Sequence, residues 1–259
     1  MSNSSLTERH AVVTGGGHGI GGDIAVALVR QGARVTLLGR NESRLAAQVE
    51  RCASYGPADY VVADVTRAEE VEEAFRQAVA RLGPVDILVN NAGTAESAPF
   101  TRITEEQWRK LFSVNVDGVF YCTKQVFGAM LAAKWGRIVN IASVAGVRGY
   151  RYIAAYCATK HAVIGLTRVL ALEAAKNGVT VNAICPGYVD TELTQQNIRN
   201  IMEKTGLSET DALKSLVSSN PQGRLIQPDE IAETVLWLCT SGSESITGQS
   251  IMLAGGEIT

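Results

Sequence analysis

The sequence lacks long apolar runs, paired cysteines and any marked excess of one charge. Its longest apolar runs end well before the roughly 18 residues that a membrane-spanning helix needs, so we expect no membrane association. The net charge is −2, and no basic cluster indicates a nucleic-acid partner. The first ten residues, MSNSSLTERH, lack the apolar core of a secretory signal. We therefore expect a cytoplasmic protein.

The five cysteines, at 52, 122, 157, 185 and 239, occur singly, and no C-x-x-C pair is present. The three histidines do not cluster with them. This pattern is typical of buried thiols in a reducing compartment and does not match the spacing of a zinc site. We therefore expect neither disulfides nor a bound metal.

Short apolar runs alternate with longer amphipathic stretches along the whole chain. Seven runs predict strands: HAVVTG, RVTLLG, DYVVAD, DILVNN, RIVNIAS, VTVNAICPG and QSIMLAGG. Helical patterns lie between them, near 20–31, 42–55, 67–82, 104–135, 153–177 and 228–240. This alternation predicts one doubly wound α/β domain over residues 1–259, with a seven-stranded parallel sheet flanked by helices on both faces. The polar region 188–226 is predicted to be a mobile flap with short helices.

VVTGGGHGIGG, residues 12–22, joins the first predicted strand to the first predicted helix through six glycines. Small residues let a backbone approach a pyrophosphate, and the N–H groups that begin a helix favour negative charge. Two registers match dinucleotide-binding patterns: Gly17, Gly19 and Gly22, or Gly15, Gly19 and Gly21. No Gly-Lys-Ser/Thr follows, which excludes a kinase-type phosphate loop. The turn alone could serve NAD, NADP, FAD or S-adenosylmethionine.

Position 40, at the tip of the second predicted strand, narrows the choice of cofactor. NAD sites usually have an acidic residue there, which accepts a bond from the adenosine ribose. This chain has Arg40, whose guanidinium suits a 2′-phosphate, with an ordinary solvated arginine as the alternative. We therefore expect NADP(H) rather than NAD(H), with His18 lining the same phosphate pocket.

Ser143, Tyr156 and Lys160 form a candidate acid–base set. Tyr156 and Lys160 are four residues apart in the predicted helix 153–177, so they share one face. We expect the ammonium to lower the phenol pKa from about 10 toward working pH, which makes Tyr156 a candidate general acid or base. Ser143 ends an apolar strand, where its hydroxyl can point over the edge of the sheet that usually binds ligands.

Taken in order, these motifs resemble the classical short-chain dehydrogenase/reductase family over nearly the whole chain. The matching segments are TGGGHGIG (14–21), Asp64-Val65, Asn90-Asn91-Ala92-Gly93, Asn115, Ser143, Tyr156…Lys160 and Pro186-Gly187…Thr191. The resemblance is closest to the 3-oxoacyl-thioester and polyketide ketoreductases and the 3-hydroxybutyrate-type dehydrogenases. It implies a Rossmann-type fold, a homotetramer, and NADP(H)-dependent hydride transfer to the carbonyl of a 3-oxoacyl thioester or related β-keto compound.

The resemblance also implies roles for individual residues. Ser143 and Tyr156 would hydrogen-bond the substrate carbonyl, and Tyr156 would donate the proton. Lys160 would hold the nicotinamide ribose, and Asn115 would fix a water that relays protons to Lys160. The implied cofactor residues are Gly15, Gly17, His18, Gly19, Ile20, Gly21, Arg40, Asp64, Val65, Asn91, Ala92, Gly93, Tyr156, Lys160, Pro186, Gly187, Val189 and Thr191. For Asn91, Asn115 or Asp64 taken singly, a turn, cap or solvated role is the alternative.

The substrate itself is less well specified by the sequence. We expect the pocket to be bounded by Ser143, Val144, Tyr150, Tyr156, Tyr188 and Leu193, with flap packing as the alternative for the two tyrosines outside the acid–base set. Reductases that dock acyl carrier protein have two basic positions beside the entrance, which correspond here to Lys134 and Asn177. The second is not basic, although Lys176 is adjacent, so a coenzyme A thioester or a free ketone stays open.

Other functions remain as alternatives. The chain could be a dehydrogenase of sugars, polyols, steroids or cyclic alcohols, or a non-catalytic dinucleotide sensor on the same fold. A methyltransferase with a similar glycine loop would need an acid at the tip of the second strand, and it would not explain the acid–base set. A sensor would have no need of that set either, so the sequence favours an enzyme.

Overall fold

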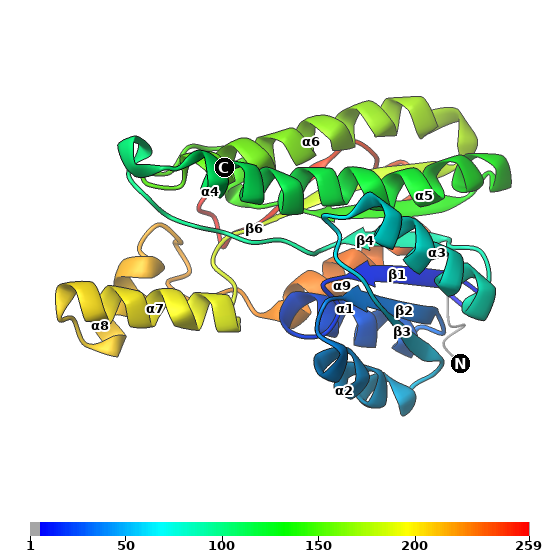
Figure 1. Ribbon diagram of the computed structural model, residues 1–259, viewed down its shortest axis with the longest axis horizontal. Helices are drawn as coiled ribbons and strands as arrows, with labels where there is room; N and C mark the ends of the chain where they lie inside the picture. Colours follow the sequence, from blue (N-terminus) through cyan, green and yellow to red (C-terminus); the bar gives the residue numbers. More distant parts are fainter. Residues whose placement is uncertain (1–5, 259) are drawn as a thin grey trace.

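The computed structural model describes residues 6–258, so half of the polar lead-in and the last residue of the expected domain lie outside it. Its centre is one parallel sheet with the strand order β3-β2-β1-β4-β5-β6-β7 (Figure 1). The strands are β1 (His10–Thr14), β2 (Arg34–Gly39), β3 (Ala58–Val62), β4 (Ile87–Asn90), β5 (Gly136–Ile141), β6 (Val179–Pro186) and β7 (Ser250–Leu253). The prediction of a doubly wound, seven-stranded parallel sheet is confirmed.

The central strands are buried along their whole length, which explains their continuous apolar runs. Every residue of β1, β4, β5 and β6 is buried. A parallel sheet has helices on both faces, so its inner strands cannot alternate between apolar and polar residues as a half-exposed strand does. The same property made these strands recognisable in the sequence.

Helices form a layer on each face of the sheet (Figure 1). The helices α1 (Gly19–Arg30), α2 (Glu42–Ala53) and α9 (Pro228–Cys239) enclose one core cluster, to which Ile24, Leu45 and Ile231 contribute. The helices α3 (Ala68–Leu82), α5 (Gly118–Ala133) and α6 (Ala154–Ala174) enclose the other, with Phe75, Val126 and Ala171. These helices begin and end close to their predicted limits, except for the predicted helix 104–135.

The predicted helix over 104–135 is helical from Glu105 to Ala133, but it contains a π turn. The segment consists of α4 (Glu105–Phe112), a π turn at Ser113–Asp117, and α5. A π turn fits an extra residue into the helix and often occurs at functional sites. Asn115 lies in this turn, and its side chain is almost fully buried. The π turn therefore sets the orientation of a predicted site residue.

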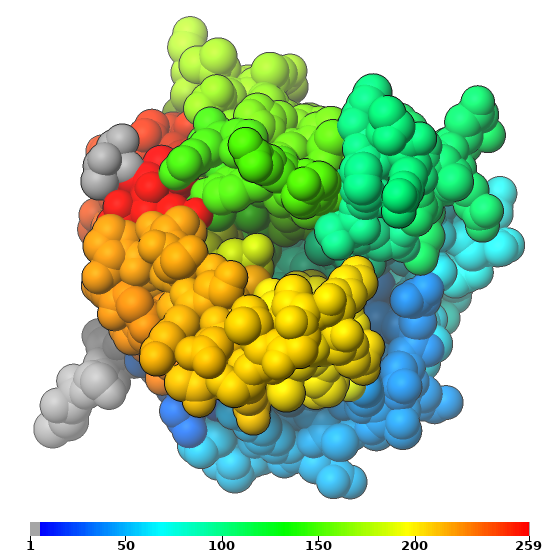
Figure 2. Space-filling model, turned by 90° about the vertical axis from the view of Figure 1, so that its left-hand side faces the viewer, coloured from blue at the N-terminus to red at the C-terminus, as the bar shows by residue number. Residues whose placement is uncertain are grey.

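The predicted flap is helical, as expected. It holds α7 (Glu192–Thr205) and α8 (Glu209–Leu216), which project beyond the sheet (Figure 1). Its two ends are joined by a parallel bridge between Val189 and Ile226. Figure 2 shows the flap lying across this face of the molecule, with a hollow between it and the parts coloured green. The flap therefore forms one wall of a cleft.

Two further observations bear on the expectations from composition. Within residues 6–258, no helix is long and apolar enough to cross a membrane. In the same residues, no group of three or more His, Cys, Asp or Glu side chains is arranged to hold a metal ion. The five cysteines are unpaired, and four of them are buried.

Candidate active site

Two cavities lie at the edge of the sheet where the strands end. The first, the flap cavity, has a volume of about 270 Å³ and lies between the end of β5, helix α6 and the flap. The second, the glycine-turn cavity, has a volume of about 740 Å³ and lies over the ends of β1, β2 and β3. Gly93 and Thr94 line both, so the two cavities meet there. Ligands of open α/β sheets usually bind at this edge, where the strand order reverses.

The glycine turn depends on residues without side chains at two positions of close approach. Gly15 has a φ of +64°, and a Cβ there would lie 2.9 Å from Asn91 Nδ2. A Cβ on Gly21 would lie 2.5 Å from the carbonyl oxygen of Gly15. Larger residues would push α1 away from the end of β1. Gly21 therefore allows α1 to pack closely against the end of β1, and it lines neither cavity.

Gly19 leaves space open between the turn and the flap. A Cβ there would have one neighbouring atom within 4 Å, Thr191 Cγ2 at 3.7 Å. In the described part of the chain, the N-cap residue of α1, His18, makes no side-chain capping bond. The first N–H groups of that helix therefore have no internal partner and are suited to an anion.

Thr14 and Asn91 hold the end of β4 against the glycine turn. Asn91 Nδ2 donates to the carbonyl oxygens of Thr14 at 3.0 Å and Gly15 at 3.2 Å. Thr14 Oγ1 accepts from the backbone N–H groups of Asn91 and Ala92, both at 3.0 Å. Asn91 therefore shapes the turn as well as lining the flap cavity. The sequence analysis missed Thr14, although its place directly before the glycines was a signal.

Most of the ionisable side chains that line the glycine-turn cavity are basic. They are His18, Arg40, Arg44 and Lys110, and they face one acidic residue, Asp64. Arg40 Nη1 lies 3.7 Å from Asp64 Oδ2. Burial raises the pKa of Asp64, but hydrogen bonds from Thr66 and the charge of Arg40 outweigh it and lower that pKa below its usual value. The cavity is therefore suited to an anionic ligand.

Arg44 and Glu192 are two residues that the sequence analysis missed. Arg44 lies in the first turn of α2, and a Cβ on Gly17 would lie 3.2 Å from Arg44 Cβ. Arg44 Nη1 donates to Glu192 Oε2 on the flap at 3.0 Å, and His18 Nε2 lies 3.9 Å from the same oxygen. One flap carboxylate therefore contacts both of these side chains beside the glycine turn.

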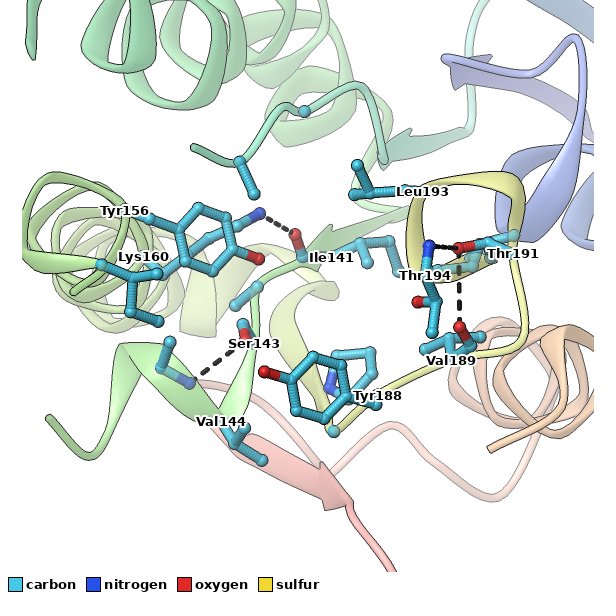
Figure 3. Close-up of a pocket in the computed structure, with 18 of the residues that line it drawn as sticks. Ile141, Ser143, Val144, Tyr156, Lys160, Tyr188, Val189, Thr191, Leu193 and Thr194 are labelled. Carbon is cyan, nitrogen blue, oxygen red and sulfur yellow. Dashed lines mark hydrogen bonds between the residues drawn. The ribbon is translucent and has the colours of Figure 1, made fainter. Parts of the chain in front are cut away.

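Ser143, Tyr156 and Lys160 meet in the flap cavity, and all six residues predicted to bound the substrate pocket line it. Ser143 follows β5, and its Oγ accepts from the backbone N–H of Ala145 at 3.1 Å, which fixes the hydroxyl. Tyr156 and Lys160 are one turn apart on α6, with Lys160 Nζ 5.7 Å from the centre of the phenol ring. Figure 3 shows the hydroxyls of Ser143, Tyr156 and Tyr188 pointing into the same space.

Burial has the largest effect on the pKa values of Tyr156 and Lys160. The expected lowering of the Tyr156 pKa is therefore wrong for this structure. Burial raises the pKa of Tyr156 to about 12, and the nearby Ser143 hydroxyl opposes this shift without cancelling it. Burial also lowers the pKa of Lys160 to about 8. Lys160 Nζ donates to the carbonyl oxygen of Ile141 at 2.8 Å rather than to the phenol (Figure 3). Tyr156 therefore keeps its proton at neutral pH.

Asn115 fixes the segment that separates the two cavities. Its Oδ1 accepts from the N–H of Thr94, and its Nδ2 donates to the carbonyl of Thr94, both at 2.9 Å. Nδ2 also donates to Thr159 Oγ1 on α6 at 3.1 Å. A Cβ on Gly93 would lie 3.3 Å from Asn115 Oδ1 and 3.7 Å from Lys160 Nζ. Asn115 and Lys160 therefore border the same small space.

The other predicted cofactor residues are divided between the two cavities. Those that line the flap cavity are Ile20, Pro186, Gly187, Val189 and Thr191. Those that line the glycine-turn cavity include Gly15, Gly17, Val65 and Ala92. The sequence motifs therefore identify residues of one continuous groove.

The two positions that the resemblance relates to carrier docking lie away from both cavities of this chain. Lys134 lies shortly before the start of β5, and Asn177 lies shortly before the start of β6. Both lie at the edge where these parallel strands begin, whereas the cavities lie where the strands end. The Asn177 side chain donates to the carbonyl of Leu131 at 3.4 Å. These two positions give no support to docking of a carrier protein beside the cavities.

Glu257, near the C-terminus, also lines the flap cavity and was missed by the sequence analysis. Its Oε1 accepts from the Tyr150 hydroxyl at 2.6 Å and from Ser219 Oγ at 2.9 Å. The residue belongs to no recognisable motif, and its partners are far away in the sequence. Only the fold reveals that it lies in the cavity wall.

Comparisons with known proteins agree with this geometry. The model of the short chain dehydrogenase family matches residues 9–201. The chain is 40% identical to the acetoacetyl-CoA reductase of Shinella zoogloeoides, over 96% of this chain and 98% of that protein. It is 35% identical to the D-beta-hydroxybutyrate dehydrogenase of Cupriavidus necator, over 97% and 98%. A solved structure of a variant actinorhodin polyketide ketoreductase with NADPH superposes with a TM-score of 0.93, at 37% identity over 99% of both chains.

Proposed function

Because this chain belongs to the short chain dehydrogenase family, we propose that it is an NADPH-dependent reductase of 3-oxoacyl thioesters or related β-keto compounds. As a member of that family it is an oxidoreductase acting on a carbonyl or the corresponding alcohol. The observation that carries the proposal is the meeting of Ser143, Tyr156 and Lys160 in one largely apolar cavity.

The groove fits a nicotinamide dinucleotide. The open space at Gly19 and the uncapped start of α1 suit a diphosphate. Arg40 and Arg44 suit a 2′-phosphate, and no carboxylate stands at the tip of β2 to accept from a ribose hydroxyl. These residues favour NADP(H) over NAD(H). When bound, NADPH supplies the hydride.

The chain's own residues then handle the carbonyl oxygen. Ser143 donates a hydrogen bond to this oxygen and orients it. As the carbon–oxygen π bond breaks, the oxygen takes the proton of the Tyr156 hydroxyl, which leaves a phenolate. Lys160 would hold the nicotinamide ribose hydroxyls of the bound cofactor, and its charge would stabilise the phenolate. A water in the space beside Gly93, Asn115 and Lys160 returns the proton.

The cavity lining supports an acyl substrate rather than a sugar. Its walls include Ile141, Val144, Ile153, Val189 and Leu193. Hydrophobic walls with a few converging hydroxyls bind a carbonyl on an apolar chain better than a polyol. Two of the relatives carry names for four-carbon β-keto or β-hydroxy acyl compounds. At neutral pH the Tyr156 phenol is protonated, which is the form that carbonyl reduction requires.

We infer that the active form is a cytoplasmic homotetramer in which each chain is one domain with a mobile flap. The five unpaired cysteines fit a reducing compartment. On α6, Val169 and Leu172 are exposed, and Phe120 is half exposed on α5. Exposed apolar side chains on neighbouring helices are suited to contact with a second copy of the chain.

A substrate panel tests the proposed function. With NADPH, kcat/KM should be at least about tenfold higher for acetoacetyl-coenzyme A or a β-keto ester than for a ketose, a difference of about 1.4 kcal/mol. A cyclic ketone provides the comparison with the steroid and cyclic-alcohol alternative. A tenfold preference for the ketose would contradict the acyl assignment. Tight NADPH binding with no turnover of any ketone would favour the sensor alternative.

A further inference from the structure

The carboxylate of Glu257 is fixed at the flap end of the substrate cavity. It reaches the cavity from the segment after β7, and its Oε1 accepts from Tyr150 in the loop before α6 and from Ser219 in the flap region. A Cβ on Gly187 would lie 3.4 Å from Oε2, so the carboxylate also lies beside the end of β6. Three separate parts of the chain therefore hold this charge in place.

The negative charge of Glu257 is not neutralised within the cavity. Among the described residues that line the flap cavity, the charged side chains are Lys160 and Glu257. Lys160 is at the catalytic end and donates to the carbonyl of Ile141. The guanidinium carbon of Arg148 lies 5.5 Å from the centre of the Tyr150 ring, and Arg148 makes no ion pair with Glu257 within residues 6–258.

The field of this carboxylate extends across the flap end of the cavity. Burial raises the pKa of Tyr150, and the hydrogen bond and charge of Glu257 raise it further. Burial and the charge of Glu257 likewise raise the pKa of Tyr188. A second negative group that entered this end would meet the same repulsion, strengthened by the low dielectric of the cavity.

We propose that Glu257 is a specificity-determining residue that excludes β-keto substrates with a free carboxylate and admits the corresponding thioesters and esters, in which that carboxyl group carries no charge. This proposal rests on the proposed function, and it specifies which chemical form of a β-keto substrate the site accepts. A β-keto acid places its carboxylate two carbons from the keto carbon. With the carbonyl held at Ser143 and Tyr156, that group would lie in the same cavity, where the cation among the described lining residues, Lys160, already donates to the carbonyl of Ile141. A site discriminates by such repulsion as well as by attraction.

The test compares a charged and an uncharged form of the same ligand. Acetoacetate and ethyl acetoacetate serve as substrates, and 3-hydroxybutyrate and its ethyl ester serve as product ligands for calorimetry with NADP⁺ present. The variant Glu257→Gln keeps an oxygen that can accept from Tyr150 and Ser219 but removes the charge. Glu72→Gln, on the exposed surface of α3, removes the same charge away from the cavity and is the matched control.

We expect the wild-type protein to prefer the esters. In Glu257→Gln the ratio of ester to acid, in kcat/KM and in binding, should fall at least tenfold, and Glu72→Gln should leave it unchanged. Tyr150→Phe keeps the carboxylate and should keep the preference. An unchanged ratio in Glu257→Gln, or a wild-type preference for the acids, would overturn the proposal. Calorimetry measures binding without turnover. If the variant shifted the ratio of ester to acid binding but neither protein reduced any substrate, the result would contradict the proposed reaction and leave the role of Glu257 supported.

Discussion

At the catalytic centre, Tyr156 and Lys160 lie one helical turn apart, and burial acts on them in opposite directions. It raises the phenol pKa to about 12 and lowers the ammonium pKa to about 8. Each shift favours the uncharged form of its group. The phenol is therefore ready to donate a proton at neutral pH, whereas its use as a base in alcohol oxidation requires a higher pH.

The two pKa values predict the pH profile of ketone reduction. Lys160 must be charged to stabilise the phenolate, and its pKa of about 8 is the lower of the two. kcat/KM for reduction should therefore be level below about pH 8 and fall above it as Lys160 loses its proton. Tyr156, with a pKa of about 12, should add no further decline below about pH 10. Steady-state rates that rise through pH 8 would contradict this assignment.

Arg40 and Arg44 are predicted to bind the 2′-phosphate together. Arg40→Asp and Arg44→Gln should each weaken NADPH binding by roughly tenfold or more, because a hydrogen bond to a charged group contributes about 1.5–3 kcal/mol. NADH, which lacks that phosphate, should be affected much less. The measurement is the Kd of each cofactor, followed by nicotinamide fluorescence.

Arg76→Gln is the control for that experiment, because Arg76 lies on α3 and pairs with Glu73 at the surface. It should leave both Kd values unchanged. Tighter binding of NADH than of NADPH by the wild-type protein would refute the cofactor preference.

The site residues that could be predicted from the sequence are close together in the chain, whereas those that could not be predicted meet only in the fold. Ser143, Tyr156 and Lys160 lie within one strand–loop–helix unit, so their spacing is visible in the chain. Glu257 meets its partner Tyr150 across 107 residues, and Glu192 meets Arg44 across 148. Such pairs are created by the fold, and no local pattern marks them.

Among the secondary-structure elements, those with a buried face could be predicted from the sequence. The inner strands and the helices that cover them have regular apolar patterns, and these elements were found close to their limits. The π turn at 113–117 was not predicted, because an extra residue in a helical turn does not change the composition of the segment in a recognisable way. Asn115, in this turn, bonds to Thr94 and Thr159, which lie in other parts of the chain.

The two ends of the flap are buried in the core at Val189 and Ile226, and exposed polar contacts join it to the rest of the molecule on two sides. Glu192 pairs with Arg44 on one side, and Ser219 bonds to Glu257 on the other. The side chains of the Arg44–Glu192 pair are 45% and 64% exposed. Exposed ion pairs contribute little to stability, so we propose that these contacts allow the flap to move.

At the scale of the whole molecule, we predict a homotetramer. Leu172 is 80% exposed and Val169 is 52% exposed on α6, although both are apolar. Light scattering at micromolar concentration should give about four times the chain mass of 27.6 kDa. Leu172→Glu should reduce the assembly to smaller species by placing a charge in the contact. A wild-type monomer would contradict the prediction.

The central claim is that Tyr156 gives its proton to the carbonyl of a β-keto substrate. The most direct measurement is kcat for acetoacetyl-coenzyme A reduction by the wild-type protein and Tyr156→Phe, together with the NADPH Kd of both. We predict that kcat falls by roughly 10²–10⁴-fold, the usual contribution of a general acid, while the Kd stays nearly the same. Near-normal turnover in Tyr156→Phe would contradict the account.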